Sequence, residues 1–175
     1  MTSKLSNEYL LQSSLLLDQA MLKIEHCEMQ LTDSQICSRP NPGINSIGNL
    51  ILHMAGNLRQ WAIVPNVADE SDERDRQQEF ADCEMSKDDL MKQLRATVDL
   101  AKQTFQSLQS LEPESLLESQ TIQGFTLSRL GAITHTTTHF VGHTHQVIML
   151  TRLILGDDYV FHWTAEEGDR SQVPV

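Results

Sequence analysis

Histidines are the residues of this sequence best suited to chemistry, because four of the seven fall within the eleven positions from 135 to 145. His135, His139 and His143 follow one another at intervals of four. On a helix this spacing puts them on one face, each about 40° from the next. His145 lies about 120° from His139, on another face, and we assign no chemistry to it. The pattern predicts a helix face dense in imidazoles.

An imidazole pair at positions i and i+4 is the natural clamp for a metal ion on a helix. Two such pairs are available, His135 with His139 and His139 with His143. The two ends of the run are about 12 Å apart along the helix, whereas metal–nitrogen bonds are about 2.0–2.1 Å long. One ion therefore does not bind all three histidines. Spacing alone leaves either pair open, and a surface cluster without metal also fits it.

A third ligand must then come from another helix, and His53 is the best candidate. It lies in the middle of a predicted helix, at the edge of that helix's apolar arc. Polar side chains along the same edge are suited to orient an imidazole by hydrogen bonds. They are Ser46, Asn49, Asn57 and Gln60. The remaining histidines, His26 and His162, are interpreted as structural.

Four long helices are predicted from apolar residues that recur at intervals of three and four. They run from Leu5 to about Leu31, from an N-cap at Asn45 or Ser46 to about Ile63, from Lys87 to Leu108 after Ser86, and from an N-cap at Thr126 to about Leu155. Each helix has one apolar stripe to bury against its neighbours. The predicted fold class is therefore all-α, a four-helix bundle with long connections that forms a single domain over residues 1–175.

The connections between these helices differ in composition. Residues 38–43 contain two prolines and a glycine, which stop a helix. Residues 69–76 contain five acids, two arginines and no apolar side chain, so they are interpreted as a solvated loop. Residues 118–125 are extended or irregular, and the sequence does not decide between the two. After Val160 we expect the tail to fold back through Phe161 and Trp163.

The composition excludes several classes of partner. The 175 residues include 24 acidic and 13 basic side chains, giving a net charge of −11. No basic field is present to attract nucleic acid or anionic lipid. The sequence shows neither a membrane span nor a secretory signal, so we expect a cytoplasmic protein. Cys27, Cys37 and Cys83 are an odd number without CxxC spacing, which favours free thiols in a reducing compartment.

Two segments resemble a known family. Residues 45–53 (NSIGNLILH) with 56–61 (GNLRQW) resemble the second helix of the DinB/YfiT-like superfamily, and residues 139–146 (HFVGHTHQ) resemble its last bundle helix. The resemblance implies a four-helix bundle in which one histidine of the second helix and an H-x-x-x-H pair of the fourth bind a divalent metal. In this chain those ligands are His53, His139 and His143. The resemblance makes His135 a neighbour one turn away.

Such a site has the composition of a catalytic metal centre. Three neutral imidazoles leave coordination positions open on Zn²⁺ or Ni²⁺. A divalent ion lowers the pKa of a bound water from about 15.7 to about 7 in favourable cases, and it deprotonates a bound thiol. Characterised relatives, as the resemblance implies, include transferases that add low-molecular-weight thiols to electrophiles. We therefore expect a metal-dependent transferase or hydrolase that acts on a small-molecule substrate.

The sequence identifies neither the substrate nor a catalytic base, because no carboxylate is placed by spacing for that role. The alternative hypothesis is a non-enzymatic helical bundle, stabilised by metal, that acts in stress response or protein association. A homodimer is our hypothesis for the assembly. It rests on the habit of the resembling family and on the apolar residues of the first helix.

Overall fold

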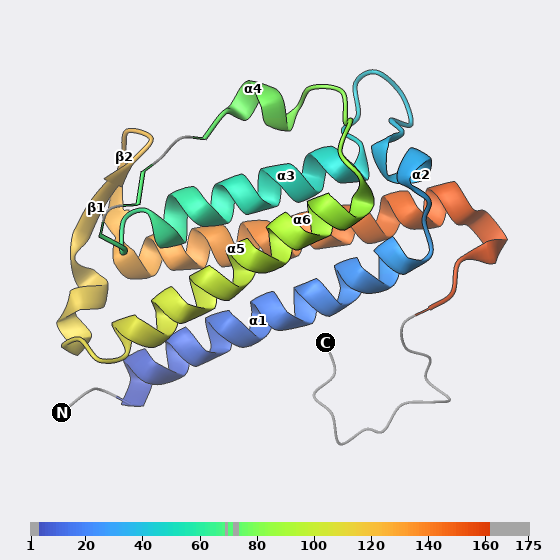
Figure 1. Ribbon diagram of the computed structural model, residues 1–175. Coiled ribbons are helices and arrows are strands. Elements are labelled where there is room, and N and C mark those ends of the chain that lie inside the picture. The colour runs from blue at the N-terminus through green and yellow to red at the C-terminus, as the bar shows by residue number, and fades with distance from the viewer. Residues whose placement is uncertain (1–3, 69, 72–73, 162–175) are drawn as a thin grey trace.

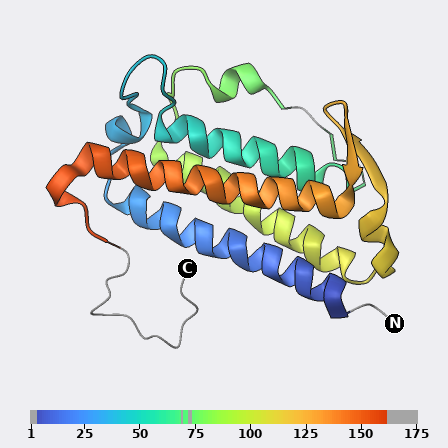
Figure 2. The same cartoon turned by 180° about the vertical axis from the view of Figure 1, so that it is seen from behind.

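Helices make up most of the chain (Figure 1). The computed structural model describes residues 4–68, 70–71 and 74–161. Its long helices lie side by side in both views (Figures 1 and 2), and they are α1 (Lys4–Met29), α3 (Ile47–Leu58), α5 (Lys87–Leu108) and α6 (Arg129–Leu155). α1 and α3 each pack against both α5 and α6. The prediction of a mostly helical chain is confirmed.

Shorter elements connect or extend the long helices. They are α2 (Asp33–Cys37), the π-helical turn η1 (Arg59–Ile63), α4 (Arg76–Glu79), the 3-10 turns η2 (Pro113–Leu117) and η3 (Gly156–Asp158), and the strands β1 (Ser119–Ile122) and β2 (Phe125–Ser128). No helix among the described residues is long and apolar enough to cross a membrane.

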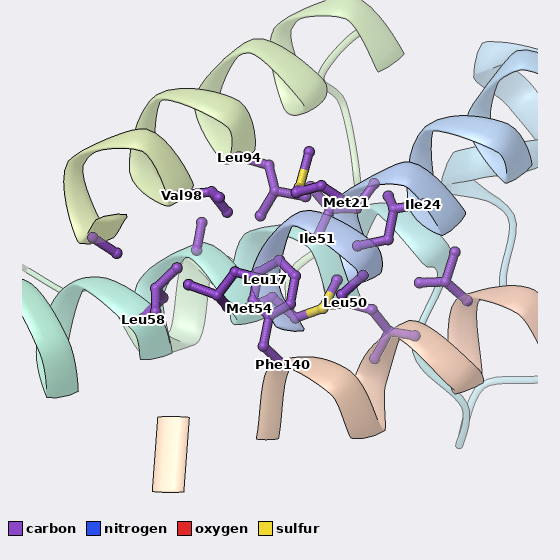
Figure 3. Close-up of a cluster of buried hydrophobic side chains, with 14 of the residues drawn as sticks. Leu17, Met21, Ile24, Leu50, Ile51, Met54, Leu58, Leu94, Val98 and Phe140 are labelled. Atoms are coloured by element: carbon purple, nitrogen blue, oxygen red, sulfur yellow. The ribbon is translucent and has the colours of Figure 1, made fainter. Parts of the chain in front are cut away.

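The core lies between the long helices, and Figure 3 shows part of it. Every long helix contributes apolar side chains to this cluster: Leu17, Met21 and Ile24 of α1, Leu50, Ile51, Met54 and Leu58 of α3, Leu94 and Val98 of α5, and Phe140 of α6. Full burial of one such side chain stabilises a fold by about 1.5–3 kcal/mol. The apolar periodicity of the sequence therefore fixes which face of each helix turns inward.

Polar caps begin the helices, and most lie where the sequence predicts them. The Ser46 side chain accepts a hydrogen bond from the Asn49 backbone N–H, and the Asn49 side chain accepts one from the Ser46 backbone, which forms a capping box at the start of α3. Ser86 caps α5 through the backbone N–H of Asp89. The predicted cap of α6 at Thr126 is wrong, because Ser128 accepts the hydrogen bond from Gly131.

A β-hairpin explains why α6 starts later than predicted. β1 and β2 pair antiparallel, with Thr121 opposite Thr126, so Thr126 belongs to a strand. Gln123 and Gly124 form the two-residue turn, with φ values of 52° and 81°. Positive φ at both positions is what a type I′ hairpin turn requires. The segment left undecided by the sequence is thus extended, and the all-α prediction misses this small sheet.

The first long helix ends earlier than predicted, whereas the last one ends at Leu155 as predicted. α1 ends at Met29 rather than near Leu31, and Thr32 then caps the short helix α2. After α6, the Val160 backbone N–H donates a hydrogen bond to the Gln30 side chain at 2.8 Å, and the Arg152 guanidinium lies 5.2 Å from the Phe161 ring centre. The chain therefore folds back at Phe161 as predicted, whereas Trp163 lies outside the described residues.

A disulfide joins Cys37 to Cys83, with a Cα–Cα distance of 5.1 Å. The prediction of three free thiols is therefore wrong for these two, and only the buried Cys27 is free among the described cysteines. The expectation failed because α2 and the segment before α5 meet in space although 46 positions separate the two cysteines. The cysteines no longer support a reducing compartment, and the cytoplasmic location stays a prediction.

Replacing both bridged cysteines, as Cys37→Ser with Cys83→Ser, is expected to lower the free energy of unfolding by about 2–4 kcal/mol. A cross-link over a loop of this length restricts the unfolded chain by that amount. Urea unfolding followed by circular dichroism measures the change. A reducing agent should destabilise the wild-type protein to the same extent and leave the double variant unaffected. Equal urea midpoints for the two proteins without reductant would contradict this role.

Candidate metal centre

Three histidines from two helices meet at one point. His53 lies on α3, and His139 and His143 lie on α6. The Nε2 atom of His139 is 3.1 Å from Nε2 of His53 and 3.1 Å from Nε2 of His143. One nitrogen from each of the three residues lies within 4.8 Å of the others, which is an arrangement that could hold a metal ion. These are the three residues singled out from the sequence.

Two of the three separations between these nitrogens suit a shared cation. With metal–nitrogen bonds of about 2.05 Å, two ligands are about 2.9 Å apart at a 90° angle and about 3.3 Å apart at a tetrahedral angle. The two observed separations of 3.1 Å fall between these values. His53 is buried, and His139 and His143 are half-buried. The centre is therefore shielded on one side and open on another.

Hydrogen bonds to the opposite ring nitrogens determine which atoms face the centre. Nδ1 of His53 lies 3.0 Å from Oε2 of Glu79, and Nδ1 of His143 lies 2.8 Å from Oε1 of Gln146. A carboxylate or amide oxygen only accepts, so each Nδ1 carries the proton and donates it. Each Nε2 is then left with a lone pair that points toward His139. A cation satisfies these lone pairs together, whereas the single ring proton of a neutral His139 satisfies one at most.

One ring nitrogen of His139 is left without a hydrogen bond among the described residues. This atom, Nδ1, is buried. Burial, together with the neighbouring His143 and His53, lowers the pKa of His139 to about 3. Burial also lowers the pKa of His143, although its hydrogen bond to Gln146 opposes the shift. Both rings are therefore neutral at pH 7, which is the form that binds metals.

Glu79 and Arg74 are parts of the site that the sequence did not reveal. Burial raises the pKa of Glu79, but hydrogen bonds and charge from Arg74, and then from His53, outweigh it and hold that pKa below its ordinary value. Arg74 Nε and Nη2 donate to the carboxylate at 2.5 and 2.8 Å. The ionised Glu79 therefore fixes the ring of His53, as carboxylates commonly do behind metal-binding histidines.

Arg74 Nη2 also lies 3.1 Å from His53 Nδ1, a contact that would need a lone pair on that nitrogen. We assign the proton to Nδ1 because a lone pair there would face the negatively charged oxygen of Glu79. Arg74 has sufficient acceptors elsewhere, since its Nη1 donates to Gln60 Oε1 at 2.8 Å. The prediction that residues 69–76 form a solvated loop is therefore wrong for Arg74, because its side chain is only 6% exposed.

The segment that contains Glu79 is held against α3 by several contacts. Asn49 Nδ2 donates to the backbone oxygens of Glu79 and Ala81 at 2.9 and 2.8 Å. Gly56 of α3 leaves room for the ion pair, since a Cβ there would collide with the Glu79 carboxylate. A Cβ at Gly48 would likewise meet the sulfur of Cys83. The disulfide therefore lies next to the segment that orients His53.

A buried hydrogen bond also fixes α3 relative to α6. Thr136 Oγ1 donates to Asn57 Oδ1 at 2.8 Å. Asn57 lies one turn after His53, and Thr136 lies about one turn before His139, so this bond joins the two helices near the centre. The predicted polar edge thus acts through Asn49 and Asn57 of α3 and Gln60 of η1. Asn49 bonds to backbone oxygens, Asn57 to Thr136, and Gln60 accepts hydrogen bonds from Arg74 and Gln123.

The other histidines that the structure describes lie outside the cluster. His135 is exposed and its ring centre lies 4.3 Å from that of Trp61, so it does not join the three converging nitrogens. Spacing alone allowed His139 to pair with either His135 or His143. In the structure, His139 and His143 are the pair that lies next to His53. His145 is exposed, and His26 contacts the backbone oxygen of Val160 at 2.6 Å. His162 lies outside the described residues.

Comparisons with known proteins show that the fold and the sequence have relatives. A solved structure of a conserved protein from Enterococcus faecalis is similar to this chain, with a TM-score of 0.68 and 23% identity over 83% of this chain and 96% of that one. At this identity the likeness shows a shared fold. A search of curated proteins gives no match. The family model described as "Protein of unknown function (DUF1572)" matches residues 4–165. Because this match spans most of the sequence, the chain belongs to that family of proteins of unknown function.

Proposed function

We propose that this chain is a DinB-like four-helix bundle that binds one divalent metal ion through His53, His139 and His143 and uses it in group transfer or hydrolysis. The observation that supports the proposal is the convergence of three Nε2 atoms, with separations of 3.1 Å about His139. Imidazole ligands without a carboxylate favour Zn²⁺ or Ni²⁺ over Mg²⁺ or Ca²⁺. Three protein ligands leave room for a substrate.

The proposed reaction is the transfer of a low-molecular-weight thiol to an electrophile, or the hydrolysis of a small molecule. The bound ion would supply Lewis acidity, which makes a thiol or a water molecule a nucleophile at neutral pH. The chain's own residues keep the ligands in place. Glu79 holds the His53 ring, Gln146 holds the His143 ring, and Arg74 keeps Glu79 ionised.

A pocket of about 480 Å³ borders His53 and His139, which gives a substrate access to the centre. This volume lies within the usual range for small-molecule sites. Among the described residues no carboxylate lines the pocket, and we assign no general base. Reactions that need only an activated nucleophile therefore suit the site best.

A non-enzymatic, metal-stabilised bundle is the second candidate, because the ligands come from two different helices. An ion bound to His53 of α3 and to His139 of α6 would cross-link them and stabilise their packing. In this case metal removal would lower the melting temperature, and no substrate would be turned over. The homodimer remains a prediction under both candidates.

The test is turnover by protein purified without an affinity tag and loaded with Zn²⁺, Ni²⁺ or Mn²⁺. The substrates are a panel of thiols with electrophiles and a panel of esters. We expect turnover that depends on metal, is abolished in His53→Ala, and persists in His145→Ala, which removes an exposed histidine of the same helix. Metal-loaded protein that turns over nothing but melts at a lower temperature after chelation would support the second candidate instead.

A further inference from the structure

The described residues that line the pocket beside the metal centre have a net charge opposite to that of the whole chain. The chain has a net charge of −11, yet the described residues that line the pocket include Arg74, Arg76 and no acid. Glu79, which lies behind His53, is already neutralised by Arg74. A cavity lined by cations on an acidic protein concentrates small anions and repels cations.

Arg76 is the cation that remains available to a ligand. The charge of Arg74 is already paired with Glu79, and three of its five N–H groups donate to the two Glu79 oxygens and to Gln60. The exposed Arg76 side chain lines the pocket and has no hydrogen bond or ion pair with any described residue. A guanidinium has donors arranged in a fork that matches a carboxylate. Its placement therefore suits an anionic group that enters from solvent.

Aromatic side chains form the apolar part of the same pocket. The ring of Trp61 lies 4.3 Å from that of His135 and 6.5 Å from that of Phe125, centre to centre, and all three line the cavity. Trp61 packs in a small apolar cluster with Ile122 and Ala132 and is only 5% exposed. Phe125, on the hairpin, is 65% exposed. Flat rings of this kind favour a planar, apolar ligand, which would cover the exposed Phe125.

We propose that this pocket binds a small organic carboxylate, with its planar apolar body against Trp61 and Phe125 and its carboxylate on Arg76. The inference deepens the proposed function by naming a substrate class, and it rests on that function only in placing the ligand beside the metal centre. Anion binding itself depends on Arg76 and the aromatic rings. It is therefore expected in metal-free protein as well.

Benzoate and its neutral isostere benzamide are the probes. The chain contains two tryptophans, Trp61 and Trp163, so a Trp163→Phe background makes Trp61 the only indole reporter of fluorescence. We expect metal-free protein to bind benzoate about tenfold more tightly than benzamide, as a charge-assisted hydrogen bond allows. Arg76→Gln should abolish this preference. Arg95→Gln removes the same charge from a residue paired with Glu25 on the surface and should preserve it.

The outcomes separate this inference from the proposed function. Equal affinity for the two probes, no binding of either, or a preference that survives Arg76→Gln would overturn the inference. Benzoate binding only in Zn²⁺-loaded protein, unchanged in Arg76→Gln, would overturn it as well and place the carboxylate on the metal, which leaves the proposed function intact. A benzoate preference that persists in His53→Ala would support the anion site even if the metal proposal failed. Circular dichroism of each variant verifies its fold.

Discussion

His143→Ala is expected to lose its stoichiometric metal, whereas His135→Ala keeps about one equivalent per chain. His143 supplies one of the three nitrogens that converge, with its Nε2 3.1 Å from that of His139. His135 instead lies against Trp61 and contributes no nitrogen to the cluster. Two imidazoles on separate helices make a much weaker site than three, because each ligand adds to the binding free energy.

Elemental analysis after gel filtration gives the metal content of both variants. His135→Ala is the matched control, since it removes the same side chain from the same helix two turns earlier. Metal lost from His135→Ala and retained in His143→Ala would reverse the assignment and move the site one turn toward the start of α6.

Glu79→Gln is expected to weaken metal binding by about 10–100-fold. Substitution of an outer carboxylate behind a metal-binding histidine typically has this effect, because the ring loses its orientation and part of its basicity. The amide left at this position can still accept a hydrogen bond from Arg74. The variant should therefore fold, although the buried guanidinium loses its counter-charge.

Competition with a chromophoric chelator measures this affinity. Glu84→Gln is the control, because Glu84 is an exposed acid of the same segment and the substitution changes the net charge equally. Unchanged affinity in Glu79→Gln would show that His53 needs no carboxylate partner. An equal loss in both variants would point to net charge rather than to the contact with His53.

The long helices could be predicted from the sequence because their apolar spacing determines which face is buried. α5 has the predicted bounds of Lys87 and Leu108, and Ser46 caps α3 as expected. The hairpin could not be predicted because its turn, Gln123-Gly124, differs from the Asn-Gly or Asp-Gly pairs that mark such turns. Thr126 then looked like a helix cap, although it pairs with Thr121 in a strand.

The sequence indicates the three histidine ligands but not Glu79, the carboxylate that orients His53. The family resemblance selected His53, His139 and His143, and the structure brings these three together. Glu79 was missed because its contact with His53 spans 26 positions and no local pattern encodes it. Gly56 was the available signal, since glycine weakens a helix by about 1 kcal/mol and so marks a close approach of another group.

The charged segment of residues 69–76 also has a contact with a residue outside it that its own composition does not indicate. Its composition predicts a solvated loop. In the structure, however, Glu70 is half-buried beside Arg59, and the Arg74 side chain is almost fully buried. A charged side chain is stable inside a protein when a counter-charge meets it. That counter-charge, Glu79, lies beyond the run, so composition alone could not identify the buried arginine. The Cys37–Cys83 bridge was missed for a related reason, because its partners meet only in the folded chain.

Anomalous X-ray diffraction at the absorption edge of the metal, from crystals of tag-free protein, tests the metal site most directly. We predict one strong peak per chain, about 2.0–2.1 Å from Nε2 of His53, His139 and His143. Data collected on both sides of the edge identify the element. Crystals of metal-loaded protein with no peak among these three nitrogens, or with a peak at other side chains, would contradict the central claim.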